Sequence, residues 1–292
     1  MDTSTRSRAG PFPVGDRHSG SPLRVIVLAG GKAGTDPLAQ AFGMSHRCLV
    51  PLGGRPLVAH VLQTAAIHPA VESLAVSVER EAFDGLFDVL SQLPGRGIVK
   101  LVEARENLVD SVLAAAHDWD GPLLITTADH ALLSAASIDA MIAALEKAQV
   151  AVAMAPREAV LATNPGGAPS FHEFAEAAYA ACNLYAVTDP EALRAAEVFR
   201  GGGRFAGNAW RVLRAFGLAD LILLRFRAIT LAGAMQRVSR RLGLRIVPVI
   251  LDDGSQAIDV DDAQTHAAAE GLLRTAAADI VVPAHAGAAS RL

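Results

Sequence analysis

The chain has 292 residues and a formal net charge of −4 at pH 7, with a sequence pI near 6.1. This balance gives no basic field of the kind that holds nucleic acid, so we expect no nucleic-acid partner. Hydrophobic residues make up 51% of the chain and aromatic residues only 5%, which favours helices packed on aliphatic strands over an aromatic-rich sandwich. The two cysteines, Cys48 and Cys182, are too far apart in sequence to indicate a metal or disulfide framework, so we expect a cytoplasmic protein.

Both ends of the chain have the composition of flexible tails. Residues 1–22 are rich in Ser, Gly, Pro and Arg without an apolar core, which predicts a disordered tail and not a secretory signal. Residues 278–292 are expected to form a second flexible tail. No run reaches the ~18 uninterrupted apolar residues of a transmembrane helix. Residues 218–235 come nearest and contain three charged side chains, so weak contact with a membrane surface is the alternative for them.

Strand-like and helix-like segments alternate over the first half of the chain. The expected strands are 24–29, 73–78, 97–103, 122–129 and 149–155. The expected helices are 56–66, 81–93, 108–119 and 137–148, with Ser137 as the N-cap of the last. This rhythm is typical of a doubly wound α/β sheet, which binds ligands at the carboxyl ends of its strands.

The rhythm changes after the Gly- and Pro-rich residues 164–170. We expect a longer strand at 177–187, mostly helix over 189–243, strands at 244–251 and 257–260, and a closing helix at 261–277. One domain over 23–277 with a helical insertion at 189–243 describes this pattern. The arginines of the insertion indicate either a lid over a phosphorylated acceptor or solvated side chains beside a packed apolar face.

A glycine loop follows the first strand, with Gly30, Gly31 and Gly34 around Lys32. Small residues at this place allow a phosphate to approach backbone N–H groups, and a lysine adds positive charge. The spacing matches neither a Walker loop nor the GxGxxG pattern of dinucleotide folds. A tight strand-to-helix turn is the alternative interpretation.

Carboxylates stand at two distant points of the chain. Asp129 ends the strand 122–129, where it could hold Mg²⁺, an ion that needs only one or two carboxylates besides phosphate oxygens. A capping or turn aspartate is the alternative. In "AIDVDDAQT" we expect Asp259 and Asp261 to point to opposite faces, so that only Asp259 shares the metal with Asp129. Asp261 or Asp262 would then cap the following helix.

Five segments in this order resemble the MobA-like nucleotidyltransferases. They are "VLAGGKAGTDPLA", "HRCLVPLGGRPLVAHVL", "DSVLAAA", "LLITTAD" and "AIDVDDAQT". The resemblance extends over residues 23–155 and, less closely, over 244–275. It implies a GT-A-type, Rossmann-like α/β fold with a mixed, mostly parallel sheet and helices on both faces.

The resemblance also implies an activity. An Mg²⁺-dependent nucleotidyltransferase would transfer NMP from an NTP, with CTP or GTP expected, to a phosphorylated small molecule and release pyrophosphate; it could act as a homodimer. The implied nucleotide-binding residues are Leu28, Ala29, Gly30, Gly31, Lys32, Gly34 and Ser111. The implied catalytic residues are Lys32, Arg47 and Asp129, the metal ligands Asp129 and Asp259, and the acceptor contacts Asn183 and His130.

Two positions depart from the family pattern. Asp36 stands where the family often has arginine, which brings a carboxylate near the phosphates unless Asp36 caps a helix that Pro37 begins. Arg47 stands where lysine is usual, and arginine is not an equivalent replacement. These departures keep two alternatives open, a non-catalytic nucleotide-binding homologue and a nucleotide-sugar glycosyltransferase of the same fold.

Overall fold

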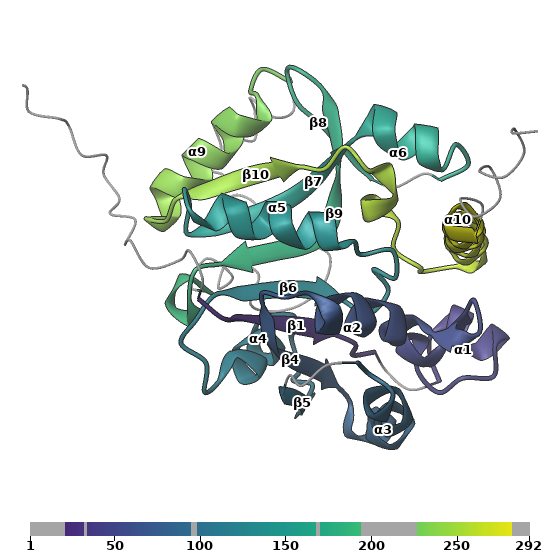
Figure 1. Cartoon of the computed structure of the whole chain (residues 1–292). Coiled ribbons are helices and arrows are strands. Elements are labelled where there is room, and N and C mark those ends of the chain that lie inside the picture. The colour runs from purple at the N-terminus through teal and green to yellow at the C-terminus, as the bar shows by residue number, and fades with distance from the viewer. Residues whose placement is uncertain (1–20, 32–33, 95–97, 168–169, 194–226, 282–292) are drawn as a thin grey trace, which may run out of the picture.

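The computed structural model describes residues 21–31, 34–94, 98–167, 170–193 and 227–281 of the chain, with the side chains of 277–281 excepted (Figure 1). Its centre is an eight-stranded sheet in the order β10-β7-β9-β6-β1-β4-β5, with β8 paired to β9. The strands are β1 (Leu23–Leu28), β4 (Val71–Val78), β5 (Ile98–Glu103), β6 (Leu123–Thr127), β7 (Val150–Pro156), β8 (Phe171–Glu173), β9 (Ala178–Val187) and β10 (Ile246–Ile250). A small ribbon pairs β2 (Pro51–Leu52) with β3 (Arg55–Pro56).

The sheet is mixed and mostly parallel, as expected from the sequence. Strands β5, β4, β1 and β6 run parallel to one another, and β10 runs parallel to β7. The antiparallel element is β9, which pairs with β6, β7 and β8. Strand β9 therefore joins β10 and β7 on one side to β6, β1, β4 and β5 on the other, and the hydrogen bonds continue across the whole sheet.

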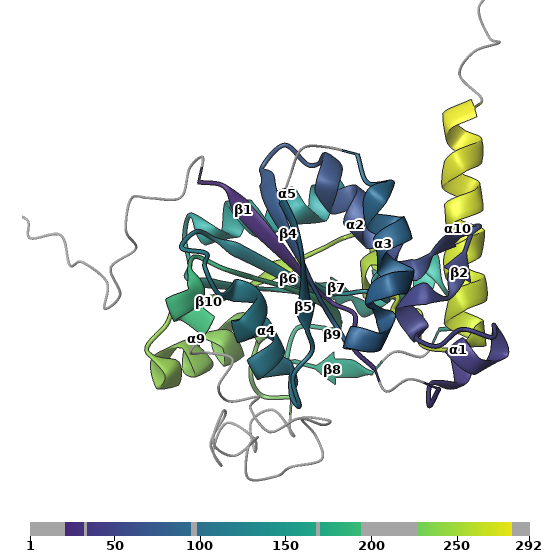
Figure 2. The same ribbon diagram turned by 90° about the horizontal axis from the view of Figure 1, so that it is seen from below.

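Helices cover both faces of the sheet (Figure 2). On one face lie α2 (Leu57–Ile67), α3 (Phe83–Ser91) and α5 (Ala135–Leu145), and on the other α4 (Leu108–Ala116) and α9 (Leu231–Leu242). Three further helices, α1 (Pro37–Ala41), α6 (Arg157–Thr163) and α10 (Ala263–Val281), lie at the edges of this sandwich. In the described part of the chain, no helix combines the length and apolarity that crossing a membrane requires.

Strand β1 shows how the sequence specifies both layers. Val25 and Val27 pack with the helices of one face, while Ile26 between them packs with the other face, and all three are fully buried. Successive side chains of a strand point to opposite faces, so a strand covered on both sides is apolar throughout. Burial of each such side chain contributes roughly 1.5–3 kcal/mol.

Several local expectations need correction. Ser134 caps α5 by accepting the N–H of Ser137, so Ser137 lies inside the helix whose start it was expected to cap. The expected strand at 257–260 is absent, and a 3-10 turn, η5 (Gly254–Ala257), precedes an extended segment. Helix α6 and strand β8 were not expected. Of the insertion 189–243, residues 231–242 are helical as expected, and 194–226 lie outside the described residues.

Candidate nucleotide and metal site

The carboxyl ends of β1, β4 and β6 meet at one edge of the sheet. Leu28, the last residue of β1, pairs with Ser77 on β4 and with Thr127 on β6. Beyond this point Ala29 N–H donates to Ser77 O at 2.8 Å, and Ala128 N–H donates to Leu28 O at 2.9 Å. The glycine loop and the segment that contains Asp129 therefore leave the sheet side by side.

The glycine loop holds a carboxylate of the protein itself. Gly31 N–H donates to both oxygens of Glu79, at 2.9 and 3.0 Å. A Cβ at Gly30 would lie 3.2 Å from Glu79 Oε1, so this position has little room for a side chain. Gly34 has a φ of +68°, which other residues adopt at a cost. Lys32 lies outside the described residues.

Asp129 and Asp259 come together from distant parts of the sequence. Val260 N–H donates to Asp129 O at 3.0 Å and so ties the segment after η5 to the segment after β6. Asp129 Oδ1 and Asp259 Oδ1 are both buried without a hydrogen-bond partner. Asn183 Nδ2 donates to the other oxygen of Asp259 at 2.6 Å. One oxygen of each carboxylate is thus left without a protein partner.

The charge of Asp129 also acts on Asp259. Burial first, and next the charge of Asp129, raise the pKa of Asp259 to about 7, against the opposing effects of Arg47 and Asn183. A second negative charge beside Asp129 is therefore unfavourable in this buried place. A divalent cation would relieve that repulsion.

Arg47 lies among three carboxylates. Its Nε is 3.1 Å from Asp36 Oδ2, and its Nη1 is 3.3 Å from Asp129 Oδ2 and also contacts Asp261 Oδ1. The other oxygen of Asp36 accepts the N–H of Ala39 at 2.9 Å and caps α1. Asp36 therefore both begins the helix at Pro37 and neutralises part of the charge of Arg47.

The strand on which Asp259 and Asp261 were expected to alternate is absent, and residues two apart in a strand would in any case lie on the same side. Asp261 N–H donates to Asp259 O at 3.1 Å, so the chain turns between them. Asp259 Oδ1 is buried, whereas the side chain of Asp261 is exposed and contacts Arg47. The cap of α10 is Asp262, whose Oδ1 accepts the N–H of Thr265 at 2.8 Å. Asp261 therefore contacts the same guanidinium group as Asp129.

The remaining candidates have defined places in the structure. His130 is 0% exposed, its Nδ1 is 3.0 Å from Thr126 Oγ1, and burial lowers its pKa to about 4. Ser111 Oγ accepts the N–H of Arg105 and donates to Asn107 O, which holds the loop before α4. Asn183 has a φ of +45° within β9. Acceptor contact by His130 and nucleotide contact by Ser111 stay predictions that these placements do not support.

The residues present fit a divalent ion held largely by its substrate. Among the described residues, no group of three or more His, Cys, Asp or Glu side chains could hold a metal by itself. Mg²⁺ keeps several waters and is usually bound through one or two carboxylates together with phosphate oxygens. Two buried, unpartnered carboxylate oxygens at the edge of the glycine loop are suited to such an ion.

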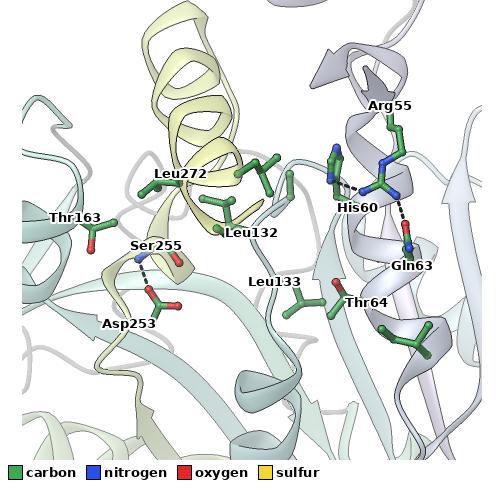
Figure 3. Close-up of a pocket in the computed structure, with 14 residues that line it drawn as sticks. Arg55, His60, Gln63, Thr64, Leu132, Leu133, Thr163, Asp253, Ser255 and Leu272 are labelled. Atoms are coloured by element: carbon green, nitrogen blue, oxygen red, sulfur yellow. Dashed lines mark hydrogen bonds between the residues drawn. The ribbon is translucent and has the colours of Figure 1, made fainter. Parts of the chain in front are cut away.

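A second hollow lies between α2, α10 and η5 (Figure 3). It has a volume of about 500 Å³, with Arg55 at one rim and Asp253 at the other. Arg55 donates to Gln63 Oε1 and lies 3.3 Å from His60 Nδ1. Asp253 accepts the N–H of Ser255 at 2.9 Å. The charged groups of this hollow are therefore anchored by neutral neighbours.

Comparison with known proteins identifies the family. The profile described as the MobA-like NTP transferase domain matches residues 25–201. The chain belongs to this family. The matched range contains the glycine loop, Arg47, Asp129 and Asn183, and it ends before Asp259 and Asp261. The second half of the carboxylate site thus lies outside the part that the family profile defines.

Curated relatives of this MobA-like chain include a cytidylyltransferase. It is 35% identical over 126 residues to the bifunctional protein GlmU of Leifsonia xyli, covering 42% of the chain and 24% of that protein. It is 33% identical over 98 residues to the 2-C-methyl-D-erythritol 4-phosphate cytidylyltransferase of Shewanella amazonensis, covering 32% of the chain and 40% of that protein. The chain thus spans less than half the length of these curated relatives.

Solved structures show the same fold at low identity. A hypothetical transferase from Thermus thermophilus has a TM-score of 0.68 at 22% identity, covering 84% of this chain and 99% of that one. The CMP:2-keto-3-deoxy-manno-octonic acid synthetase complexed with CTP has a TM-score of 0.54 at 12% identity, covering 88% and 100%. The MobA-like chain therefore has the Rossmann-like fold of nucleotidyltransferases.

Proposed function

We propose that this chain is an Mg²⁺-dependent nucleotidyltransferase. It would transfer NMP from an NTP, CTP or GTP, to a phosphorylated small molecule and release pyrophosphate. Membership of an NTP transferase family supports the general reaction. The observation that carries the metal-dependent form is the pair of buried, unpartnered oxygens on Asp129 and Asp259, beside the glycine loop.

The proposed chemistry asks little of the protein beyond positioning. An oxygen of the acceptor phosphate forms a bond to the α-phosphorus while the bond to the pyrophosphate oxygen breaks in line with it. The amides of Gly30 and Gly31 would bind phosphate oxygens. Gly34 N–H donates to Ser45 O at 3.0 Å, so Gly34 would shape the loop without donating to the phosphates. Asp129 and Asp259 would hold Mg²⁺, which when bound neutralises charge on the phosphates. Alignment of the two substrates supplies most of the remaining acceleration.

Arg47 has a separate role in this proposal. Its guanidinium now contacts Asp36, Asp129 and Asp261, so it balances charge that a divalent ion would otherwise balance. Once Asp129 holds the ion, Arg47 can turn to the triphosphate, where its planar donors suit phosphate oxygens. Asp36 and Asp261 would keep it near the site during that exchange. The unusual aspartate at position 36 is thus compatible with activity.

The direct test is pyrophosphate release by the full chain, with each of the four nucleoside triphosphates, Mg²⁺ and a panel of phosphorylated acceptors. We expect one triphosphate and acceptor pair to give turnover that depends on Mg²⁺. Asp129→Asn keeps the shape of the side chain and should lower kcat on the order of 10³-fold. Full activity in this variant would remove Asp129 from the metal site, and triphosphate binding without turnover would favour a non-catalytic homologue.

Matched variants identify the second metal ligand. We expect Asp259→Asn to lose Mg²⁺-dependent turnover as Asp129→Asn does. Asp261→Asn removes only one partner of Arg47, so we expect it to change turnover less than about tenfold. The opposite order of the two effects would assign the metal to Asp129 and Asp261.

A further inference from the structure

A backbone N–H of the glycine loop already donates to the side chain of the residue that follows β4. Gly31 N–H, which the proposed function assigns to a phosphate oxygen, donates to both carboxylate oxygens of Glu79, at 2.9 and 3.0 Å. Glu79 directly follows β4, so the sheet fixes its main chain at the same edge as the loop. A carboxylate and a phosphate are both oxyanions, and they cannot occupy the same N–H together.

We propose that Glu79 is an internal competitor of the triphosphate and that nucleotide binds only as this carboxylate leaves Gly31. The inference rests on the proposed function and adds a regulatory contact to the same site. In the proposed function the loop amides and the two metal-binding carboxylates hold the triphosphate. Glu79 does the opposite, because it lowers the affinity for the triphosphate. It touches the loop and no residue of the carboxylate pair among its printed contacts.

The space around the loop restricts where a phosphate can approach. A Cβ at Gly31 would have no atom within 4 Å, whereas a Cβ at Gly30 would meet Glu79 Oε1 at 3.2 Å and Ala104 Cβ at 3.5 Å. The outer side of the loop is therefore open, and the inner side is filled by the carboxylate. A triphosphate can enter from the open side, but it reaches the inner side only by replacing Glu79.

The charges around Glu79 also support competition with the triphosphate. Among the described residues, no lysine or arginine forms an ion pair with Glu79, so its main anchor is the Gly31 N–H. The pKa of Cys48 is raised to about 12, first by burial and next by the charge of Glu79, so Glu79 adds negative charge to this part of the protein. A triphosphate adds more negative charge there, and the repulsion is largest without a metal ion.

Calorimetric titration of the full chain with CTP and with GTP, in EDTA at low salt, tests the competition. Glu79→Ala removes the competitor, and we expect about tenfold tighter triphosphate binding, as for loss of one charged hydrogen bond. Glu79→Gln has the same shape and a weaker acceptor, so its gain should be smaller. Glu81→Gln removes an equal charge from an exposed residue two positions along and should leave the affinity nearly unchanged.

The outcomes separate this inference from the proposed function. Wild-type binding of a triphosphate, with unchanged affinity in Glu79→Ala and Glu79→Gln, would overturn the competition and leave the nucleotide site in place. Weaker binding in both variants would also overturn it, because Glu79 would then be a nucleotide contact. No binding in any variant, in EDTA and again with Mg²⁺ in its place, with thermal unfolding showing that each is folded, would overturn the proposed function and the competition together.

Discussion

The candidate nucleotide and metal site and the second hollow differ in how their buried polar groups are paired. Six buried side-chain atoms lack a hydrogen-bond partner among the described residues, and all belong to segments at or near the carboxyl ends of β1, β4 and β6. They are His46 Nε2, Ser77 Oγ, Thr127 Oγ1, Asp129 Oδ1, His130 Nε2 and Asp259 Oδ1. The second hollow, between α2, α10 and η5, contributes none of them.

The second hollow rests instead on a satisfied network. Gln256 is 0% exposed, and its amide donates to Leu132 O at 2.8 Å and to Asp253 Oδ2 at 3.1 Å. Its carbonyl accepts from Ser134 N at 3.2 Å and from Ser137 Oγ at 2.8 Å. Unpartnered buried groups cost stability and are retained where a ligand completes them, whereas satisfied groups hold the scaffold. The comparison thus supports the proposed role of the nucleotide and metal site and indicates a supporting role for the groups beside the second hollow.

The largest effect on stability should come from the satisfied network. Gln256→Ala leaves Leu132 O, Ser134 N and Ser137 Oγ without this partner, so we expect a loss of about 3 kcal/mol in the free energy of unfolding. Chemical denaturation of the full chain measures it. Gln264→Ala, at an exposed glutamine of α10, is the matched control and should cost far less. Equal costs for the two variants would contradict the role of this network.

A gain in stability is expected from a substitution in the nucleotide and metal site, where buried groups lack partners. Because the folded protein raises the pKa of Asp259 from 3.8 to about 7, it binds more protons than the unfolded chain in that window. Stability therefore falls as pH rises from about 4 to 7. In EDTA at pH 8, Asp259→Asn should melt a few degrees above wild type, about 1 kcal/mol, although we expect it to lose turnover.

Melting temperatures measured at several pH values test the cause of this gain. The difference in melting temperature between Asp259→Asn and wild type should shrink toward pH 4, where both side chains are neutral. Asp84→Asn, on the exposed side of α3, should show no such trend. A gain for Asp259→Asn that persists unchanged at pH 4 would remove the burial of charge as its cause.

Much of the fold follows from local pattern. The uninterrupted apolar run Val25, Ile26 and Val27 predicts a strand buried on both faces, and the structure has it. The carboxyl ends of parallel strands share an edge, so the glycine loop and Asp129 could be placed together before any coordinates. Asp259 was chosen as the partner of Asp129 from an expected strand at 257–260, and that strand is absent, because the 3-10 turn η5 occupies Gly254–Ala257.

The rest depends on side-chain directions that tertiary structure sets. The contact of Glu79 with Gly31 joins residues 48 positions apart, and no spacing in the sequence indicates it. Asn183 reaches Asp259 because β9 pairs irregularly with β7 near this point and gives Asn183 a positive φ. The three carboxylates around Arg47 come from three separate segments. Ion pairs of this kind cannot be read from the order of residues.

The smallest effect should follow a change at the rim of the second hollow. Arg55 is exposed, and the neutral Gln63 and His60 are its hydrogen-bond partners. Arg55→Ala should therefore change the free energy of unfolding by no more than about 0.5 kcal/mol. Pyrophosphate release should also be unchanged, because Arg55 belongs to the supporting side of the molecule. A loss of turnover without loss of stability would show that the second hollow takes part in the reaction. The distinction between the nucleotide and metal site and the supporting second hollow would then be wrong.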